Sequence, residues 1–416
     1  MSSLLLRMLV LLLGTVPWVR AEDFALRDGD TVVFLGDSIT AARGYSRIIE
    51  NYTLLRFPER KIRFFNAGRG GETAKGALSR LDEAVFAGGA TVLTVAYGIN
   101  DIGWGTKADE FHRREHLDSL REIVRRCREK GVRVFVCSAA ITAEDPATAA
   151  QGFLQKMGDD ALAQAREQGA GAIDVQRGMR AVQRRMLAAG AAGKDEQKRP
   201  RMHTEDGVHL NDLGQMAMAV TILKGLGAPA DVSWATIDAS RAVAVEMESC
   251  TISGISRSER ELRFLRLDSR QPLNLQPLWM LMGFHLPITD ELNRYGLTVR
   301  GLAEGRWEML AGNRPLGTWT AAQLASGVNL ASASGEPWEP GGPWHAQAQL
   351  LKTVTDLRDE MDWTRRDVPR LLAGHPERDA IAEEARNIGN ALQSLQRRLA
   401  KPIITEFILR RAAGKS

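Results

Sequence analysis

The chain has 416 residues, more than one hydrophobic core usually organises, so one large domain with one or two smaller modules is expected. Hydrophobic residues make up 44% and charged residues 25%, which excludes a disordered or collagen-like chain. The net charge is +4 at pH 7, and the basic residues are interspersed with acids, so the charge pattern argues against a nucleic-acid partner.

The N-terminal segment has the pattern of a secretory signal. Arg7 precedes a short apolar run over residues 9–16, and the small residues Val19 and Ala21 fit a cleavage site after Ala21. The alternative is a membrane anchor, although the run is well short of the roughly 20 residues that span a bilayer. No later segment is long and apolar enough to span. We therefore expect residues 1–21 to be a signal peptide and the mature protein to be exported, to the periplasm or the extracellular space.

Between residue 31 and about residue 226, short β-branched runs alternate with amphipathic helical stretches, which is typical of an α/β domain. Strands, nearly continuous in apolar residues, are predicted over 31–35, 63–66, 91–96, 133–138 and 171–175. Helices are predicted over 43–56, 74–87, 109–130, 148–168, 176–189 and, after the N-cap Asn211, to about Gly225. Right-handed crossovers would give a three-layer α/β/α fold with a flavodoxin-like parallel sheet, and functional groups at the carboxyl ends of its strands.

The rest of the chain changes in character. Strand-like runs at 261–267, 295–299, 306–310 and 316–319, with hairpin-type turns at 311–313 and 301–305, predict a small, mostly antiparallel β module. Two helical patterns follow, at 345–371 and 376–399, and the apolar spacing of Leu350, Leu351, Val354 and Leu357 predicts an antiparallel pair that packs on a partner surface. The expected division is a signal peptide (1–21), an α/β domain (22–230), a β-rich module (231–335) and a C-terminal helical region (336–416).

The first predicted strand runs directly into Gly36-Asp37-Ser38. This places the Ser38 hydroxyl at the strand's carboxyl end and beside a helix N-terminus, where backbone N–H groups favour a developing negative charge. Taken alone the tripeptide is a weak signal, because a β-turn with Ser38 as a helix N-cap explains it equally well.

Two further polar segments follow predicted strands. Asn66 to Thr73 contains three glycines in four positions, and a backbone N–H such as that of Gly71 can donate there to an oxyanion, although a plain flexible turn has the same composition. The third strand leads into Gly98-Ile99-Asn100-Asp101. Asn100 could cap a helix, but on the same rim as Ser38 and Gly71 a donor role is the better interpretation.

The fourth segment is Asp206-Gly207-Val208-His209, in a polar loop before the last helix of the α/β domain. A carboxylate three residues before an imidazole can hold one ring nitrogen and leave the other to take a proton from a serine. A lone pair of this kind more often reflects surface polarity or a stray metal ligand. The argument therefore depends on all four segments together.

In order and spacing, these four segments resemble the signature blocks of the SGNH (GDSL) hydrolases, over roughly residues 31–226. The resemblance implies a serine esterase in which Ser38 is the nucleophile and an oxyanion donor, Gly71 and Asn100 are further oxyanion donors, His209 is the base and Asp206 orients it. The chain departs from the family pattern at Arg69 and Gly70, which replace a small or apolar pair, and at Ala74, where a second threonine is common. The first departure alters the charge near the site and leaves substrate choice open. The C-terminal region looks like the extension found on some bacterial members of the family.

The remaining chemistry-bearing residues do not assemble into a site. Three cysteines, Cys127, Cys137 and Cys250, are too few for a disulfide framework and lack metal-finger spacing, and a bridge between the first two is a minor alternative to buried thiols. The other histidines lack metal-ligand spacing. Trp104 follows Asn100 closely enough to line a pocket, whereas Trp307, Trp319, Trp338 and Trp344 are better explained as core of the β module than as a sugar-stacking platform.

The sequence thus predicts acyl transfer to Ser38 and then to water, with no metal ion or organic cofactor implied. The expected substrate is a small-molecule or glycan ester, with short acyl groups on carbohydrate as the first choice and lipid or phospholipid esters as the second. An inactive SGNH scaffold that binds glycan is the alternative from another functional class, and the presence of all five motif residues argues against it.

Overall fold

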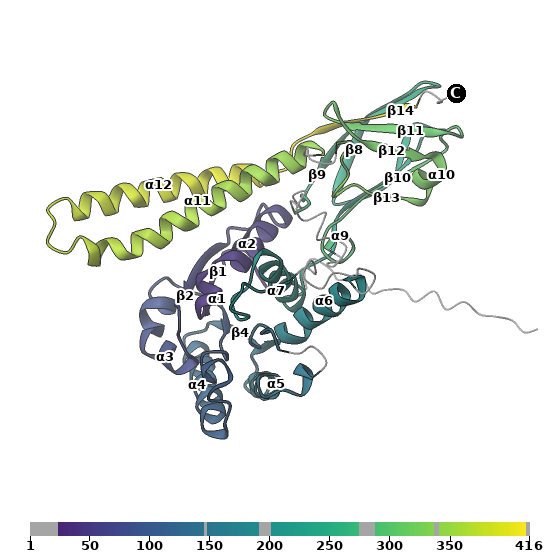
Figure 1. Cartoon of the computed structure of the whole chain (residues 1–416). Coiled ribbons are helices and arrows are strands. Elements are labelled where there is room, and N and C mark those ends of the chain that lie inside the picture. The colour runs from purple at the N-terminus through teal and green to yellow at the C-terminus, as the bar shows by residue number, and fades with distance from the viewer. Residues whose placement is uncertain (1–23, 145–147, 191–200, 274–287, 337–340, 413–416) are drawn as a thin grey trace, which may run out of the picture.

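A parallel five-stranded sheet organises the first half of the chain in the computed structural model, which describes residues 24–144, 148–190, 201–273, 288–336 and 341–412 (Figure 1). The strand order is β2-β1-β3-β4-β5, and all neighbouring pairs are parallel. The strands are β1 (Thr31–Gly36), β2 (Arg63–Gly68), β3 (Val92–Ala96), β4 (Arg133–Cys137) and β5 (Gly171–Ile173). Every residue of β1 and β3 is buried, which explains their unbroken apolar sequences.

Helices cover both faces of this sheet, as the sequence predicts for an α/β/α fold. Apolar side chains of α2, α6 and α7 pack on one face, and those of α3 and α4 pack on the other, while α5 contributes to both. The helices are α1 (Ser38–Ala41), α2 (Gly44–Arg56), α3 (Ala74–Ala77), α4 (Glu110–Glu129), α5 (Phe153–Glu167), α6 (Val175–Gly190) and α7 (Asp212–Gly225). The strand order reverses beside β1, so the carboxyl ends of β1, β2 and β3 meet at a topological switch point, where α/β folds place their ligands.

The helix predicted over 74–87 is present but irregular. α3 lasts four residues and continues as a 3-10 turn (Leu78–Arg80) and a π turn (Asp82–Phe86). The helix predicted from residue 148 begins only at Phe153, after a short 3-10 turn. Asn211 does cap α7, because its side chain accepts from the Gly214 N–H at 3.1 Å.

Two packed sheets follow the α/β domain. One has the order β13-β10-β6-β7 and the other β12-β11-β14-β9-β8, and only the β6–β10 pair is parallel. Their facing side chains form one apolar core, in which the Phe264 and Phe407 rings stack at 5.3 Å. The elements are β6 (Asp231–Asp238), β7 (Val243–Glu248), β8 (Cys250–Arg257), β9 (Glu261–Asp268), α9 (Ile288–Glu291), β10 (Arg294–Arg300), β11 (Arg306–Ala311), β12 (Arg314–Thr320), α10 (Ala321–Ser326), β13 (Val328–Asn329) and β14 (Thr405–Arg411).

Two features of this module differ from the sequence-based expectation. The turn at 311–313 is a hairpin between β11 and β12, with positive φ at Gly312 and Asn313, but residues 301–305 join β10 to β11, which belong to different sheets. β14 lies in the range assigned to the C-terminal helical region, and it pairs between β11 and β9 in the middle of its sheet. The chain therefore returns to the β module after its last helices.

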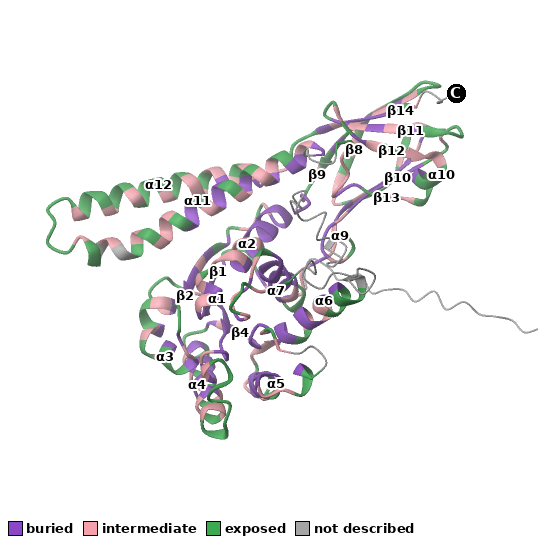
Figure 2. Cartoon of the chain, viewed as in Figure 1, coloured by how far each residue is buried: buried purple, intermediate pink, exposed green. Residues whose placement is uncertain are grey.

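A helical hairpin, α11 (Pro343–Leu371) and α12 (Arg378–Leu399), extends from the β module along the α/β domain (Figure 1). The half of the hairpin nearer the β module has residues buried against the α/β domain, and the end farther from the β module is mostly exposed (Figure 2). Leu351 and Val354 are buried, whereas Leu350 and Leu357 are each 56% exposed. Only part of the apolar stripe predicted from the sequence therefore packs against another part of the protein. Within the described ranges, no helix combines the length and apolar character needed to cross a bilayer.

A buried ion pair joins this hairpin to α2. Arg358 donates to both carboxylate oxygens of Glu50, at 2.7 and 2.8 Å, and Gln396 donates to the same carboxylate at 2.9 Å. Thr355 also donates to Asn51 at 2.6 Å. This buried, bidentate pair fixes the hairpin in one position on α2, because any other register would leave buried charges without partners.

Candidate active site

Ser38 lies where β1 ends and α1 begins. Asp37 is the N-cap of α1, with its carboxylate accepting the Ile39 N–H at 2.9 Å. Gly36 has no room for a side chain, because a Cβ there would lie 2.2 Å from the Thr40 hydroxyl oxygen. The turn from strand to helix is therefore tight, and it leaves Ser38 half-buried at the carboxyl edge of the sheet.

The loop before α7 brings His209 to this serine. His209 Nε2 lies 2.9 Å from Ser38 Oγ, and Nδ1 of the same ring is hydrogen-bonded to Asp206 Oδ2. The other Asp206 oxygen accepts from the backbone N–H groups of Val208 and His209, each at 2.9 Å, and from the Thr204 hydroxyl at 2.8 Å. These hydrogen bonds, the one from the His209 ring first, hold the pKa of Asp206 well below its usual value. The carboxylate is thus fixed and ionised, and the imidazole has one nitrogen held and the other facing the serine.

Gly71 and Asn100 stand on the same rim. Gly71 has φ +72°, and no atom lies within 4 Å of the place where a Cβ would be, so its backbone faces open space. Asn100 Nδ2 donates to the Glu72 carbonyl oxygen at 3.1 Å. An amide carries two N–H groups, so the second remains to donate to a substrate oxygen.

Trp104 holds the Asn100 amide in this orientation. Its indole Nε1, which can only donate, lies 2.9 Å from Asn100 Oδ1, so the Nδ2 end must face Glu72. The edge of the Trp104 ring also meets the His209 ring at 5.7 Å. Trp104 has φ +57°, an unfavourable conformation for a bulky residue, and 51% of it is exposed. A strained, exposed aromatic in contact with two predicted site residues indicates a functional position.

Residues 34–217 match the model of the GDSL-like lipase/acylhydrolase family. This segment is a GDSL-like hydrolase domain. The family resemblance inferred from the four segments is thereby confirmed, and the protein is an enzyme that hydrolyses carboxylic esters. No protein with a curated description matches the sequence.

Solved structures share the fold of this GDSL protein. The gut microbial diltiazem-metabolizing enzyme BT4096 is 23% identical and superposes with a TM-score of 0.78, covering 94% of this chain and 100% of that one. The β module and the helical hairpin therefore belong to a shared architecture. Two smaller structures each match 49% of this chain. One is an acetylxylan esterase from Geobacillus stearothermophilus, with 20% identity, a TM-score of 0.41 and 96% of its own chain covered. The other is LAE5 from the metagenome of Lake Arreo, Spain, with 22% identity, a TM-score of 0.42 and 98% of its own chain covered.

A buried network lies beneath the Gly71–Asn100 side of the site, and it was not predicted from the sequence. The Glu72 carboxylate accepts from the Tyr97 hydroxyl at 2.6 Å and from Arg80 Nε at 2.7 Å. Burial raises the pKa of Tyr97 far above its usual value, so the phenol stays a donor. This network fixes the Glu72 backbone carbonyl to which Asn100 donates. The only sequence signal for it was the placement of Glu72 directly after Gly71.

Asp101 is buried beneath the rim and contacts Ala74 and His116. Its Oδ1 accepts the Ala74 N–H at 3.0 Å and faces His116 Nδ1 at the same distance.

Asp37, next to Ser38, is also buried, and loss of hydration raises its pKa to about 6. Asn66 ties β2 to α1, because its amide donates to the Thr40 carbonyl at 2.7 Å and its oxygen accepts the Gly68 N–H.

The other residues singled out in the sequence lie away from Ser38. Cys127, Cys137 and Cys250 are free thiols, and among the described residues no three His, Cys, Asp or Glu side chains form a group that could hold a metal ion. Trp307 and Trp344 are buried in the β-module core and Trp319 packs partly buried against it, as expected, whereas Trp338 lies outside the described residues. The predicted signal peptide lies outside the described residues.

Proposed function

We propose that Ser38, His209 and Asp206 catalyse ester hydrolysis through an acyl-serine intermediate. Ser38 Oγ attacks the ester carbonyl carbon while its proton passes to His209 Nε2, and the carbonyl oxygen becomes an oxyanion. The bond to the alcohol then breaks, and His209 returns the proton to the departing oxygen. Water repeats the sequence on the acyl-serine, which releases the acid and restores Ser38.

The observation that carries this proposal is the 2.9 Å contact between Ser38 Oγ and His209 Nε2 in a ring whose other nitrogen is held by an ionised Asp206. The oxyanion would accept from the N–H groups of Ser38 and Gly71 and from the free N–H of Asn100. These donors are in place before the charge develops, so they need no reorganisation as it forms.

For the substrate, we propose short acyl groups, acetyl first, carried by carbohydrate. The support is the rim itself: Gly71 and Trp104 are exposed and Asn100 and His209 are half-buried, so the acyl group meets polar donors and an open surface. A long acyl chain needs an apolar tunnel in which to bury its methylene groups, each worth about 0.8 kcal/mol.

A panel of esters at matched concentrations tests this proposal. We expect kcat/KM to be higher for 4-nitrophenyl acetate and for acetylated oligosaccharides than for 4-nitrophenyl palmitate. Faster turnover of the palmitate would favour the lipid-esterase alternative, and no turnover of any ester would favour the inactive glycan-binding scaffold.

We also propose that the enzyme is exported, on the strength of the charged, apolar and small-residue pattern in residues 1–21. Intact-mass analysis of protein recovered outside the cytoplasm should give a chain that begins at Glu22. Retention of residues 1–21 would indicate an anchored form.

A further inference from the structure

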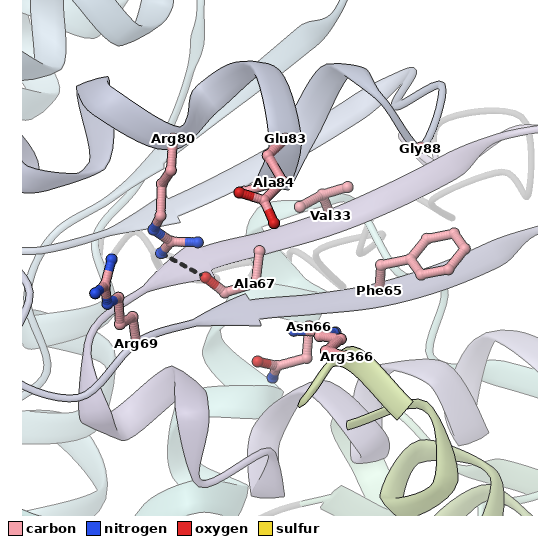
Figure 3. A pocket seen from close by; sticks show the side chains of 10 residues that line it. All are labelled: Val33, Phe65, Asn66, Ala67, Arg69, Arg80, Glu83, Ala84, Gly88 and Arg366. Carbon is pink, nitrogen blue, oxygen red and sulfur yellow. Dashed lines mark hydrogen bonds between the residues drawn. The ribbon is translucent and has the colours of Figure 1, made fainter. Parts of the chain in front are cut away.

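A groove of about 360 Å³ runs beside the edge strand β2, between the turns that follow α3 and the helical hairpin (Figure 3). Its apolar lining includes Val33 and Phe65. Its charged lining is three arginines, Arg69, Arg80 and Arg366, and one acid, Glu83. Two regions far apart in the sequence therefore build it, because Arg366 comes from α11 and the other residues come from the hydrolase domain.

The arginines differ in how their charge is compensated. Arg80 is bound to the Glu72 carboxylate, and it also donates to the Ala67 carbonyl at 2.7 Å. Within the described part of the chain, Arg69 and Arg366 have no hydrogen-bonded or ion-paired side-chain partner. Arg366 only stacks on the Trp363 ring, at 5.2 Å. With Arg80 neutralised, Arg69 and Arg366 are the two lining guanidinium groups that have no ion-paired partner among the described residues, and both are exposed.

Arg366 is exposed at the mouth of the groove. Partial desolvation lowers the pKa of its guanidinium, the carboxylates of Asp359 and Asp362 raise it, and the weaker effects of Arg43 and Arg80 lower it.

Arg69 connects the groove to the turn that precedes Ser38. The Arg69 N–H donates to the Gly36 carbonyl at 2.9 Å, which fixes Arg69 beside the turn that carries Ser38. Arg69 is two residues before Gly71, so their Cα atoms lie at most about 7.6 Å apart. The Arg69 side chain lines the groove at the end where β2 finishes (Figure 3). A substrate with its ester at Ser38 can thus extend past Arg69 into the groove.

We propose that the groove binds a carboxylate on the alcohol part of the ester, with Arg69 and Arg366 as the residues that recognise it. The inference rests on the proposed function and specifies its substrate: an acylated carbohydrate that bears an acid group, as a uronic acid does. Guanidinium groups bind planar carboxylates through paired hydrogen bonds, and the apolar lining suits the carbon face of a sugar ring. The C-terminal hairpin would thereby contribute to substrate choice.

A matched pair of substrates tests this site. The methyl glycoside of an O-acetyl galacturonate and its carboxyl methyl ester differ in charge and by one methyl group, and acetate release reports hydrolysis of both. We expect wild-type kcat/KM to favour the anion by roughly 10-fold, the size of one charge-assisted hydrogen bond. Arg69→Gln and Arg366→Gln should each bring this ratio towards 1, and added salt should do the same.

Arg365→Gln is the matched control, because it removes one charge from the same helix at a residue paired with Asp362 outside this groove. It should leave the ratio unchanged. An equal rate on both substrates in wild type, or a preference that survives both Arg69→Gln and Arg366→Gln, would overturn the inference. In either case 4-nitrophenyl acetate would still be hydrolysed, whereas loss of that activity in wild type would mean that the proposed function itself is wrong.

Discussion

Asn100→Ala probes the oxyanion site with the least disturbance to the fold. The residue is half-buried at the rim, and its amide makes one hydrogen bond to the Glu72 carbonyl and accepts one from Trp104. Removing a comparable side-chain donor costs about 10² to 10³ in kcat, or roughly 2.7 to 4 kcal/mol, because the bond is stronger in the transition state than in the ground state. We therefore expect kcat for 4-nitrophenyl acetate to fall by that factor, with a much smaller change in KM.

Trp104→Phe tests whether the indole positions that amide. The variant keeps an aromatic ring beside His209 but removes the N–H that faces Asn100 Oδ1. A neutral hydrogen bond contributes about 0.5 to 1.5 kcal/mol, so we expect kcat to fall about 2- to 13-fold. In an Asn100→Ala background the same change should have no further effect. A wild-type kcat in Asn100→Ala, or fully additive losses in the double variant, would refute this account of the oxyanion site.

Four further predictions follow from other contacts. Ser38→Ala should lower ester hydrolysis to near background, and a chelator should leave the wild-type rate unchanged in the same assay. Asp206→Asn should lower kcat by on the order of 10⁴, because the imidazole loses the carboxylate that orients it. In Asp37→Asn the helix cap is kept but the buried carboxyl is removed. Burial raises the pKa of Asp37 to about 6. The protonated carboxyl therefore stabilises the folded state fully below pH 4, and this stabilisation is lost as the pH rises through 6. Relative to wild type, the variant should therefore gain up to about 3 kcal/mol in free energy of unfolding between pH 4 and pH 7, measured by urea denaturation. Arg358→Leu should destabilise the protein by about 3 to 5 kcal/mol by leaving Glu50 buried without its partner, and the double variant Glu50→Leu/Arg358→Leu should recover most of that loss.

Each of these has a contradicting result. Loss of activity on chelation would replace the serine mechanism with metal-activated water. A fully active Asp206→Asn would mean that the loop alone holds His209. A pH-independent stability difference for Asp37→Asn would mean that the carboxyl is solvated. Equal stability of the single Arg358→Leu variant and wild type would mean that the hairpin does not depend on its buried ion pair.

The α/β domain could be predicted because its signals are local. Strands such as β1 and β3 are buried on both faces, so their sequences are continuously apolar. The candidate site was predictable for the same reason, since Ser38, Asn100 and the glycine-rich segment each follow such a strand directly.

The missed features depend on contacts between distant residues. β14 pairs with β9 and β11 only after the chain has passed through both long helices, and nothing within residues 405–411 reports those partners. The glycines at 301–305 mark a turn, but turn composition does not say which sheet the next strand joins. Leu357 fits the apolar spacing of α11, yet the ion pair with Glu50 places the neighbouring Arg358 against α2 and leaves Leu357 exposed.

The network beneath the oxyanion site was missed for a related reason. Glu72 and Arg80 are charged residues eight positions apart, a spacing that predicts no contact, so their ion pair could not be inferred from the sequence. The short distance between Trp104 and Asn100 along the chain predicted that Trp104 lies near the site, but it did not predict the hydrogen bond between the two side chains.

The most direct test of the central claim is covalent labelling of the wild-type enzyme with a fluorophosphonate probe, followed by mass mapping of the labelled peptide. We predict one phosphonyl group per chain, attached to Ser38, and a loss of esterase activity in proportion to the labelling. The Ser38→Ala variant should not be labelled. Labelling of another residue in step with inactivation, or full activity after Ser38 is labelled, would contradict the claim.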